Sequence, residues 1–201
     1  MKLLAFTDYH ESDTCFAQIK KKAAEADVLL CCGDFTIFGN NAEKELLRLN
    51  KLGKPVILIP GNHEDGNPID ELCEELENVY NADRSVVQLD HFSVFGYNNG
   101  GFTREDKELE NLLPQVKKNM IQPLIMITHG PPSNTKLDKL PFFGHVGNKS
   151  INKAIKELKP KILFCGHLHE TFGVKDKIEN TLIINPGPVG MIVEIKNEEK
   201  K

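Results

Sequence analysis

The chain has 201 residues, of which 40% are hydrophobic and 27% charged, and this composition predicts a folded protein with one sizeable core. Its formal charge of -4 and its small number of arginines disfavour a general surface for nucleic acid or anionic membranes. No apolar run approaches the roughly 18 residues that a membrane span requires, and the N-terminus is too polar for a signal peptide. We therefore expect one domain over residues 1–201 in the cytoplasm, with a frayed tail at 195–201 and reduced cysteines.

Apolar runs that stop at polar clusters alternate with polar, helix-like segments along the chain. This alternation is typical of an α/β protein with buried strands and covering helices. The expected strands, in chain order, are 3–6, 28–32, 55–59, 86–89, 92–97, 124–127, 162–165, 182–185 and 191–195. The expected helices are 13–26, 41–53, 68–78, 106–119 and 148–158.

Two places in the chain predict strands that are not linked by helices. No helix fits between the runs at 86–89 and 92–97, so we expect a hairpin that turns at Asp90 and His91. The last two runs, divided by PGPVG at 186–190, are expected to form another adjacent pair. Hairpins between and after helix-linked strands predict mixed rather than all-parallel sheets.

Five of the expected strands end in side chains that a divalent metal ion would bind. They lead, in chain order, to Asp8 and His10, to Asp34, to Asn62 and His63, to His129, and to His167 and His169. The carboxyl edge of strands is where ligands collect in α/β folds, because loops converge there over a rigid scaffold. These side chains are therefore expected to meet in one place.

Each of these residues, taken alone, also has a simpler structural interpretation. Asp8 could cap the helix that begins after residue 12, and Asp34 and Asn62 are common turn residues. A single histidine is more often a hydrogen-bonded surface or core residue than a ligand. Their joint placement at strand ends beside glycines, which let the backbone turn sharply, favours a shared site.

Five short blocks carry a resemblance to a known family. They are D-x-H at 8–10, G-D at 33–34, G-N-H-E at 61–64, T-H at 128–129 and G-H-x-H at 166–169. In this order the chain resembles the calcineurin-like metallophosphoesterases, and the segments FGHVGNKSI, CGHLHE and INPGPVG are similar to its small prokaryotic or archaeal members. The resemblance implies a four-layer αββα sandwich of two mixed sheets, with a two-metal centre at the carboxyl ends of the strands.

The resemblance also implies a role for each matched residue. The ligands would be Asp8, His10 and His169 for the first metal, Asn62, His129 and His167 for the second, and Asp34 as a bridge. His63 would stay unligated and act as the general acid. Glu64 stands where many relatives carry Asp, and we expect it to support the ligands from behind.

The implied ligands are imidazole, carboxylate and amide groups without a thiolate. Such a set suits Mn²⁺, Fe or Zn²⁺, and we expect two divalent ions, with manganese for activity and iron, zinc or nickel as alternatives. Two such ions make the pocket cationic inside an acidic protein, as binding a phosphate ester requires. A hydroxide that bridges the metals would attack phosphorus in line, and His63 would give its proton to the leaving group.

The position of the arginines bears on the type of ester. A monoester carries an extra negative charge and usually meets bidentate arginine, and the protein-phosphatase branch of the family has arginines beside its G-D and G-N-H blocks. Here those places read GDFTIFGN and PGNHE, and Arg104 is the one arginine expected to reach the site. We therefore expect a phosphodiesterase for a small ester such as a nucleotide. A phosphomonoesterase, a nuclease and a non-catalytic scaffold stay open, as does a homo-oligomer.

A second set of residues is expected at the wall of the pocket. It comprises Asn98, together with Asn99, before a pair of glycines, Arg104 in the same loop, and His145 in FGHVGNKS. For the segment around His145, capping of the following helix is the alternative to substrate contact. His91 is interpreted as a turn residue without a role.

Overall fold

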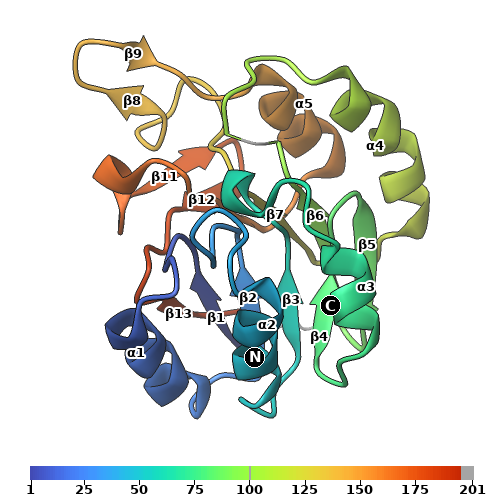
Figure 1. Ribbon diagram of the computed structural model, residues 1–201. Coiled ribbons are helices and arrows are strands. Elements are labelled where there is room, and N and C mark those ends of the chain that lie inside the picture. Colours follow the sequence, from blue (N-terminus) through green and yellow to red (C-terminus); the bar gives the residue numbers. More distant parts are fainter. Residues whose placement is uncertain (100, 196–201) are drawn as a thin grey trace.

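The computed structural model describes residues 1–99 and 101–195, whose backbone forms two large β-sheets flanked by helices (Figure 1). The first sheet has the strand order β13-β1-β2-β3-β4, with β1 Lys2–Phe6, β2 Val28–Cys31, β3 Val56–Leu58, β4 Val79–Asn81 and β13 Met191–Glu194. The second has the order β11-β12-β10-β7-β6-β5, with β5 Ser85–Leu89, β6 Phe92–Tyr97, β7 Leu124–Thr128, β10 Ile162–Phe164, β11 Lys175–Ile178 and β12 Thr181–Ile184.

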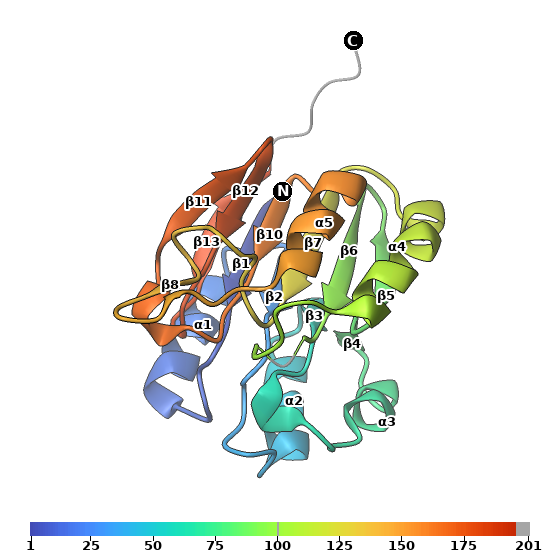
Figure 2. The same cartoon turned by 90° about the horizontal axis from the view of Figure 1, so that it is seen from above.

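Helices cover the outer face of each sheet (Figure 2). They are α1 Asp13–Ala23, α2 Ala42–Asn50, α3 Ile69–Glu74, α4 Lys107–Asn119 and α5 Lys149–Leu158, with short 3₁₀ helices η1 Asn62–Glu64 and η2 His169–Thr171. The first three helices pack on the first sheet, and α4 and α5 pack on the second. A small hairpin of β8 Lys139–Leu140 and β9 Gly144–His145 projects beside the second sheet.

The inner strands, such as β2, β3, β7 and β10, are apolar because both faces of each sheet are buried there. In β1, Leu4 and Phe6 belong to the cluster under the first helices, whereas Leu3 and Ala5 belong to the cluster between the two sheets. Successive side chains of a strand point to opposite faces, so one apolar run serves two cores. The predicted four-layer αββα sandwich with two mixed sheets is confirmed.

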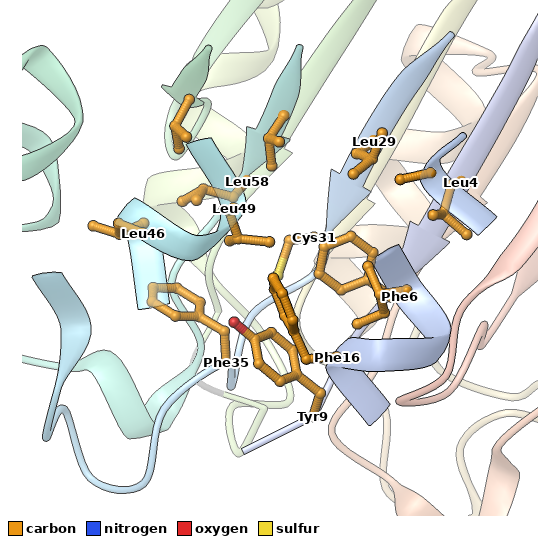
Figure 3. Close-up of a cluster of buried hydrophobic side chains, with 14 of the residues drawn as sticks. Leu4, Phe6, Tyr9, Phe16, Leu29, Cys31, Phe35, Leu46, Leu49 and Leu58 are labelled. Atoms are coloured by element: carbon orange, nitrogen blue, oxygen red, sulfur yellow. The ribbon is translucent and has the colours of Figure 1, made fainter. Parts of the chain in front are cut away.

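The cluster under α1 and α2 fixes the start of two loops that matter for the site (Figure 3). Tyr9 and Phe35 follow β1 and β2, and both side chains are buried against residues of the helices. Each apolar side chain of this size contributes roughly 1.5–3 kcal/mol when it is fully buried. The polar residues on either side of these anchors are thereby held at fixed positions along the loops.

The expected helices all form, but three of them end before the residues that we predicted. The first ends at Ala23 rather than residue 26, the second at Asn50 rather than residue 53, and the third at Glu74 rather than residue 78. The hairpin at Asp90 and His91 is confirmed, since Leu89 pairs with Phe92 across the turn.

The expected pairing of the last two apolar runs is wrong. Strand β12 lies beside β10 in the second sheet, whereas β13 pairs antiparallel with β1 in the first. Two prolines in the intervening PGPVG cannot donate to a ladder, and the carbonyl of Gly187 accepts a hydrogen bond from Thr7 N at 3.3 Å. The segment therefore crosses between the sheets instead of turning back on itself.

Other differences concern strands without a continuous apolar run and the end of the chain. Strand β11 alternates exposed and half-buried residues in the sequence KDKI, which gives no strong apolar signal. The predicted tail begins at Ile195, but this residue is 1% exposed and its N–H donates to the carbonyl of Met1 at 2.8 Å. The rest of that tail, 196–201, lies outside the described residues. No helix in the described part of the chain is long and apolar enough to cross a membrane.

Candidate metal centre

The candidate ligands lie on loops that leave parallel strands at their carboxyl ends. Strands β1, β2 and β3 are parallel in the first sheet, and β7 and β10 are parallel in the second. The two sets of loops meet: the N–H of His167 donates to both oxygens of Asp8 at 3.1 and 3.2 Å. His129 Nε2 lies 3.4 Å from Asp34 Oδ2. Side chains from both sheets thus share one site.

The first group of candidate ligands contains Asp8, His10 and His169. One ligand atom of each lies within 4.8 Å of the others. His169 Nε2 is 3.5 Å from Asp8 Oδ1, and the rings of His10 and His169 have centroids 5.5 Å apart. This group matches the first metal site that the resemblance implies.

The second group contains Asp34, His129 and His167, whose ligand atoms also lie within 4.8 Å of one another. Asn62 belongs to it as well, because its Oδ1 lies 3.0 Å from His129 Nε2 and 3.1 Å from His167 Nδ1. The four side chains therefore converge on the place where the second metal is expected.

Asp34 connects the two groups and His63 lies next to it. A third set of potential ligand atoms within 4.8 Å contains His10, Asp34 and His63. His63 Nε2 is 3.9 Å from Asp34 Oδ2, and its ring centroid is 4.5 Å from that of His10. The seven candidate ligands and His63 consequently form one continuous cluster with Asp34 between its halves.

Two histidines are oriented by backbone carbonyls behind the site. Nδ1 of His10 is 3.0 Å from the carbonyl oxygen of Thr36, and Nδ1 of His129 is 2.9 Å from that of Cys32. A ring that donates Nδ1–H to a carbonyl keeps Nε2 for a ligand, which is the usual arrangement of histidines at metal sites. These contacts leave Nε2 of both rings to the cluster.

The position of His129 shows why the cluster suits a cation. With its Nδ1–H donated to Cys32, a neutral ring presents the lone pair of Nε2 to Asn62 Oδ1 and Asp34 Oδ2. Three acceptors cannot face one another unless a proton or a metal ion lies between them. The donor set of imidazole, carboxylate and amide oxygen fits a divalent ion.

The charges around Asp34 and His129 favour their ionised forms when no metal is bound. Burial opposes ionisation, but the hydrogen bond to His129 lowers the pKa of Asp34 to about 2. Burial likewise lowers the pKa of His129, but the neighbouring Asp34 outweighs it and raises that pKa to about 9. Burial lowers the pKa of His167 to about 4, so this ring is neutral at pH 7. The hydrogen bond to Asp8 raises the pKa of His169.

Four candidate ligands have left-handed backbone conformations that residues with a Cβ rarely adopt. The φ angles are 53° at Asp8, 43° at His10, 51° at Asp34 and 67° at His167. A residue in this region costs about 1–3 kcal/mol unless its surroundings enforce it, and such residues concentrate at functional sites. Left-handed backbone thus recurs in the loops that carry the candidate ligands, and the contacts around each of these residues must hold it in place.

Glu64 holds two of these loops together and is 1% exposed. Its Oε2 accepts hydrogen bonds from the N–H groups of Asp34 and Gly61 at 2.9 and 2.7 Å. Its Oε1 accepts from the N–H and hydroxyl of Thr36 at 2.8 and 2.6 Å. Burial raises the pKa of Glu64, while the hydrogen bonds from Thr36 and Gly61 oppose that rise. The carboxylate thus supports Asp34 from behind.

The close packing at the centre depends on glycines. A Cβ on Gly61 would lie 2.2 Å from Asp34 Oδ1, and one on Gly33 would lie 2.8 Å from His129 Nδ1. Gly33 also has a φ of 95°, which favours glycine. These two glycines let Asp34 and His129 approach the backbone closely, in addition to allowing the sharp turns that we predicted from the sequence.

The remaining predicted residues make their hydrogen bonds outside the two ligand groups. Asn98 donates from Nδ2 to Asp65 at 3.5 Å, next to the G-N-H-E block. Arg104 donates from its guanidinium to the carbonyl of His145, and His145 Nδ1 is 2.8 Å from Asp138 Oδ1. His145 belongs to β9, so its carbonyl connects Arg104 to the β8–β9 hairpin.

Two structural alternatives from the sequence can be compared directly with the helix ends. The N-cap of α1 is Ser12, whose side chain accepts from Cys15 N at 3.3 Å, so Asp8 does not cap this helix. Asn148 caps α5 by accepting from the N–H groups of Ser150 and Ile151. The capping interpretation of FGHVGNKS is therefore correct for its asparagine.

The structure also identifies neighbours of the site that sequence reasoning missed. Thr36 binds Glu64, and Phe38 stacks on His63 with ring centroids 4.5 Å apart and an interplanar angle of 13°. The sequence signal for Phe38 is an aromatic residue directly before a glycine in the loop GDFTIFGN. Its contact with His63 depends on the loop conformation, which that signal does not specify.

Comparisons with known proteins agree with the fold and with the kind of site. The family model described as calcineurin-like phosphoesterase matches residues 1–171. An uncharacterized protein of Methanocaldococcus jannaschii is 32% identical over 203 residues, which cover 96% of this chain and 91% of the relative.

Two further similarities are more distant. A probable cyclic nucleotide phosphodiesterase of Synechococcus is 26% identical over 165 residues, which cover 78% of this chain and 62% of that protein. The solved structure of TT1561 of Thermus thermophilus is similar with a TM-score of 0.72 at 14% identity. The match covers 92% of this chain and 88% of the TT1561 chain. The likeness to that structure supports the fold alone.

Proposed function

Because this chain belongs to the calcineurin-like phosphoesterase family, we propose that it is a metal-dependent hydrolase of small phosphodiesters. The observation that carries the proposal is the position of Asp34 between two groups of ligand atoms, with His63 beside it. Asp8, His10 and His169 would hold one divalent ion, and Asn62, His129 and His167 the other. Asp34 would contribute to both. Manganese is the ion that we propose for activity.

When bound, divalent ions would supply the Lewis-acid chemistry that activates water and stabilises negative charge on the phosphoryl group. Hydrolysis forms a bond from phosphorus to the oxygen of water and breaks the bond to the leaving oxygen. That oxygen must gain a proton, and a positioned general acid typically contributes about 10²- to 10⁴-fold to the rate. We assign this proton transfer to His63.

The contacts of His63 direct one ring nitrogen toward the cluster. The N–H of Phe38 donates to Nδ1 at 3.1 Å when the ring is neutral, which places the ring proton on Nε2. As general acid the ring must carry a proton on both nitrogens, so this contact has to lengthen before Nε2 gives up its proton. Nε2 is the atom that lies 3.9 Å from Asp34 and faces the cluster. The side chain is 20% exposed, which leaves room for a leaving group.

The partners of the arginines favour a diester over a monoester. A bidentate arginine usually compensates the second charge of a monoester. All three arginines lie within the described residues and have partners outside the two ligand groups, namely Asp13 and Glu45 for Arg48, Asp83 and Glu108 for Arg84, and the carbonyl of His145 for Arg104. The similarity to a probable cyclic nucleotide phosphodiesterase also supports a diester.

Asn99, next to the candidate site, has a buried hydrogen-bond donor without a partner in the described part of the chain. Its Oδ1 accepts from the N–H of Gly130, the residue after His129, at 2.8 Å. The residue is 6% exposed, and its Nδ2 has no hydrogen-bond partner among residues 1–99 and 101–195. A buried donor without a partner costs about 1–3 kcal/mol.

The test is hydrolysis of a chromogenic phosphodiester beside its monoester by chelated protein to which Mn²⁺ is restored. His63→Ala is the test variant, and His91→Ala is the matched control because His91 is an exposed residue of the β5–β6 turn. We expect diester turnover that requires metal and His63 but is unaffected by the control. Faster hydrolysis of the monoester would refute the diester proposal, and turnover that persists without metal would refute the mechanism.

A further inference from the structure

An exposed aromatic ring lies directly against the proposed general acid. Phe38 is 76% exposed, and its ring is nearly parallel to that of His63 at a centroid distance of 4.5 Å. One face of the Phe38 ring therefore meets the histidine, while much of its remaining surface is open. A single exposed phenylalanine is common on protein surfaces, so exposure alone indicates nothing. The way in which this one is held distinguishes it.

Phe38 sits at the tip of a turn that is fixed to the candidate site. The N–H of Ile37 donates to Glu11 Oε1 at 2.9 Å, and the N–H of Gly39 donates to Thr36 Oγ1 at 3.0 Å. Thr36 in turn binds Glu64, which supports Asp34. Phe38 itself has a φ of 51°, an unfavourable backbone conformation for a side chain of this size. The protein thus maintains strain to present this ring beside the site.

A second exposed ring contacts the other half of the cluster. Phe102 is 74% exposed, and its ring meets that of His167 edge to face, with centroids 4.6 Å apart and an interplanar angle of 89°. His63 is grouped with His10 and Asp34, whereas His167 is grouped with Asp34 and His129. Each half of the cluster therefore has one exposed phenylalanine in contact with one of its histidines.

We propose that Phe38 is a stacking platform for a flat aromatic leaving group, so that the substrates are diesters with an aryl or nucleoside group on the departing oxygen. This inference rests on the proposed function. The oxygen that takes the proton of His63 must come within hydrogen-bond distance of Nε2, and Phe38, stacked on the same ring, is the exposed aromatic surface within reach of the group attached to that oxygen. Aromatic groups gain from offset stacking on such a ring, whereas small alkyl groups gain much less.

The first experiment compares leaving groups rather than absolute rates. Bis(p-nitrophenyl) phosphate, a dinucleotide and glycerophosphoethanolamine are hydrolysed by the wild-type metal-loaded protein, by Phe38→Leu and by Phe142→Leu. Leucine keeps an apolar side chain and the backbone N–H that binds His63, but it cannot stack. Phe142 is the matched control because it is an exposed phenylalanine in the β8–β9 turn.

We expect Phe38→Leu to lower the aryl-to-alkyl ratio of kcat/KM by roughly 5-fold or more, the range of aromatic stacking on a base. The control should leave that ratio unchanged. If the dinucleotide responds as the aryl diester does, the platform accepts nucleosides, and if it does not, the platform is limited to aryl groups. An equal loss on all three substrates would mean that Phe38 only positions His63, and this result would overturn the proposal.

The second experiment measures binding without turnover. The chain contains no tryptophan, so Phe38→Trp introduces a single fluorophore at the platform and Phe142→Trp a single fluorophore at the control position. Phenylphosphonate should change the emission at position 38 in zinc-loaded protein, whereas methylphosphonate should not, and neither should affect position 142. An unchanged emission with phenylphosphonate at position 38, at concentrations that inhibit hydrolysis, would contradict stacking.

The two experiments separate this inference from the proposed function. If diesters are hydrolysed but neither the leaving-group ratio nor the emission responds, the platform is refuted and the phosphodiesterase stands. If no ester is hydrolysed while phenylphosphonate still changes the emission at position 38, the proposed function fails and the aromatic binding site remains. If Phe38→Leu instead changes the sedimentation of the protein and not the ratio, the ring belongs to a contact between proteins, and the proposal is overturned.

Discussion

The carboxylate of Glu64 accepts a hydrogen bond from the backbone N–H of Asp34 at 2.9 Å. This contact joins the loop after β3 to the loop after β2, and Asp34, like His10, belongs to two groups of potential metal ligands. The φ of 51° at Asp34 requires such support, because this backbone conformation is unfavourable in its absence. Glu64 is thus expected to act on the centre through Asp34, without touching the substrate.

Replacing Glu64 by glutamine should damage both stability and metal binding. Each carboxylate oxygen of Glu64 now accepts two hydrogen bonds, for example from the N–H groups of Asp34 and Gly61. In glutamine one of these oxygens becomes an NH₂ group, which cannot accept them. The buried donors then lose their acceptor, at a cost of about 1–3 kcal/mol each. We expect a lower free energy of unfolding and weaker Mn²⁺ binding, measured by denaturation of chelated protein and by competition with a chelator.

Glu45 provides the matched control for that substitution. It is also fully buried, and its carboxylate binds the hydroxyl of Tyr9 and the guanidinium of Arg48, under the helices rather than at the site. Glu45→Gln should lower stability without changing metal affinity. Equal metal affinity in Glu64→Gln and the wild type would show that Glu64 has no positioning role.

Metal binding should release protons near neutral pH. Without metal the pKa of His129 is raised to about 9, so its ring is protonated at pH 7, whereas the pKa of His167 is lowered to about 4 and that ring is already neutral. A metal must displace the proton of His129, so the apparent affinity should rise about tenfold per pH unit up to about pH 9 from this group. Calorimetry in buffers of different ionisation enthalpy counts the protons released.

The same shift predicts how stability of the chelated protein depends on pH. The pKa of His129 is raised above its ordinary value of 6.5, so its contribution to stability is complete below that pH and is lost as the pH rises through about 9. In Asp34→Asn the partner charge is absent, and we expect the pKa of His129 to fall. Thermal unfolding between pH 6 and 10 tests the first point, and titration of the ring by NMR tests the second. An unchanged titration in Asp34→Asn would refute the ion pair.

Gly61→Ala should disrupt the centre although it adds only a methyl group. The new Cβ would lie 2.2 Å from Asp34 Oδ1 and 2.8 Å from His129 Cε1, so residues of both sheets would have to move. We expect loss of diester hydrolysis and at least a tenfold loss of metal affinity, since such sites tolerate little displacement of their ligands. Gly66→Ala is a useful comparison, because nothing lies within 4 Å of its added Cβ. Its positive φ makes it a test of strain alone, and it should retain metal affinity.

How far the sequence predicts this molecule depends on whether the signal is local. The convergence of the candidate ligands could be predicted because each follows a buried strand, as Asp8 follows β1 and Asp34 follows β2, and parallel strands bring such ends together. The strands that pair with β12 and with β13 could not be predicted, because hydrogen-bonded neighbours in a sheet need not be neighbours in the chain. The same limit applies to Phe38. Its ring reaches His63 because side chains that are distant in the sequence, such as Glu64, fix the conformation of its loop.

Backbone strain away from the centre should be removable without loss of function. Lys159 ends α5 with a φ of 51°, a left-handed position that glycine commonly occupies after a helix. Left-handed backbone costs about 1–2 kcal/mol in a residue with a Cβ, and glycine removes this cost. Glycine also loses more conformational entropy on folding, which costs roughly 0.5–1 kcal/mol. Lys159→Gly should therefore raise the free energy of unfolding by about 0.5–1 kcal/mol. Denaturant unfolding measures the gain, and diester hydrolysis should not change. A free energy of unfolding that falls in Lys159→Gly would contradict the backbone strain that we assign to this position.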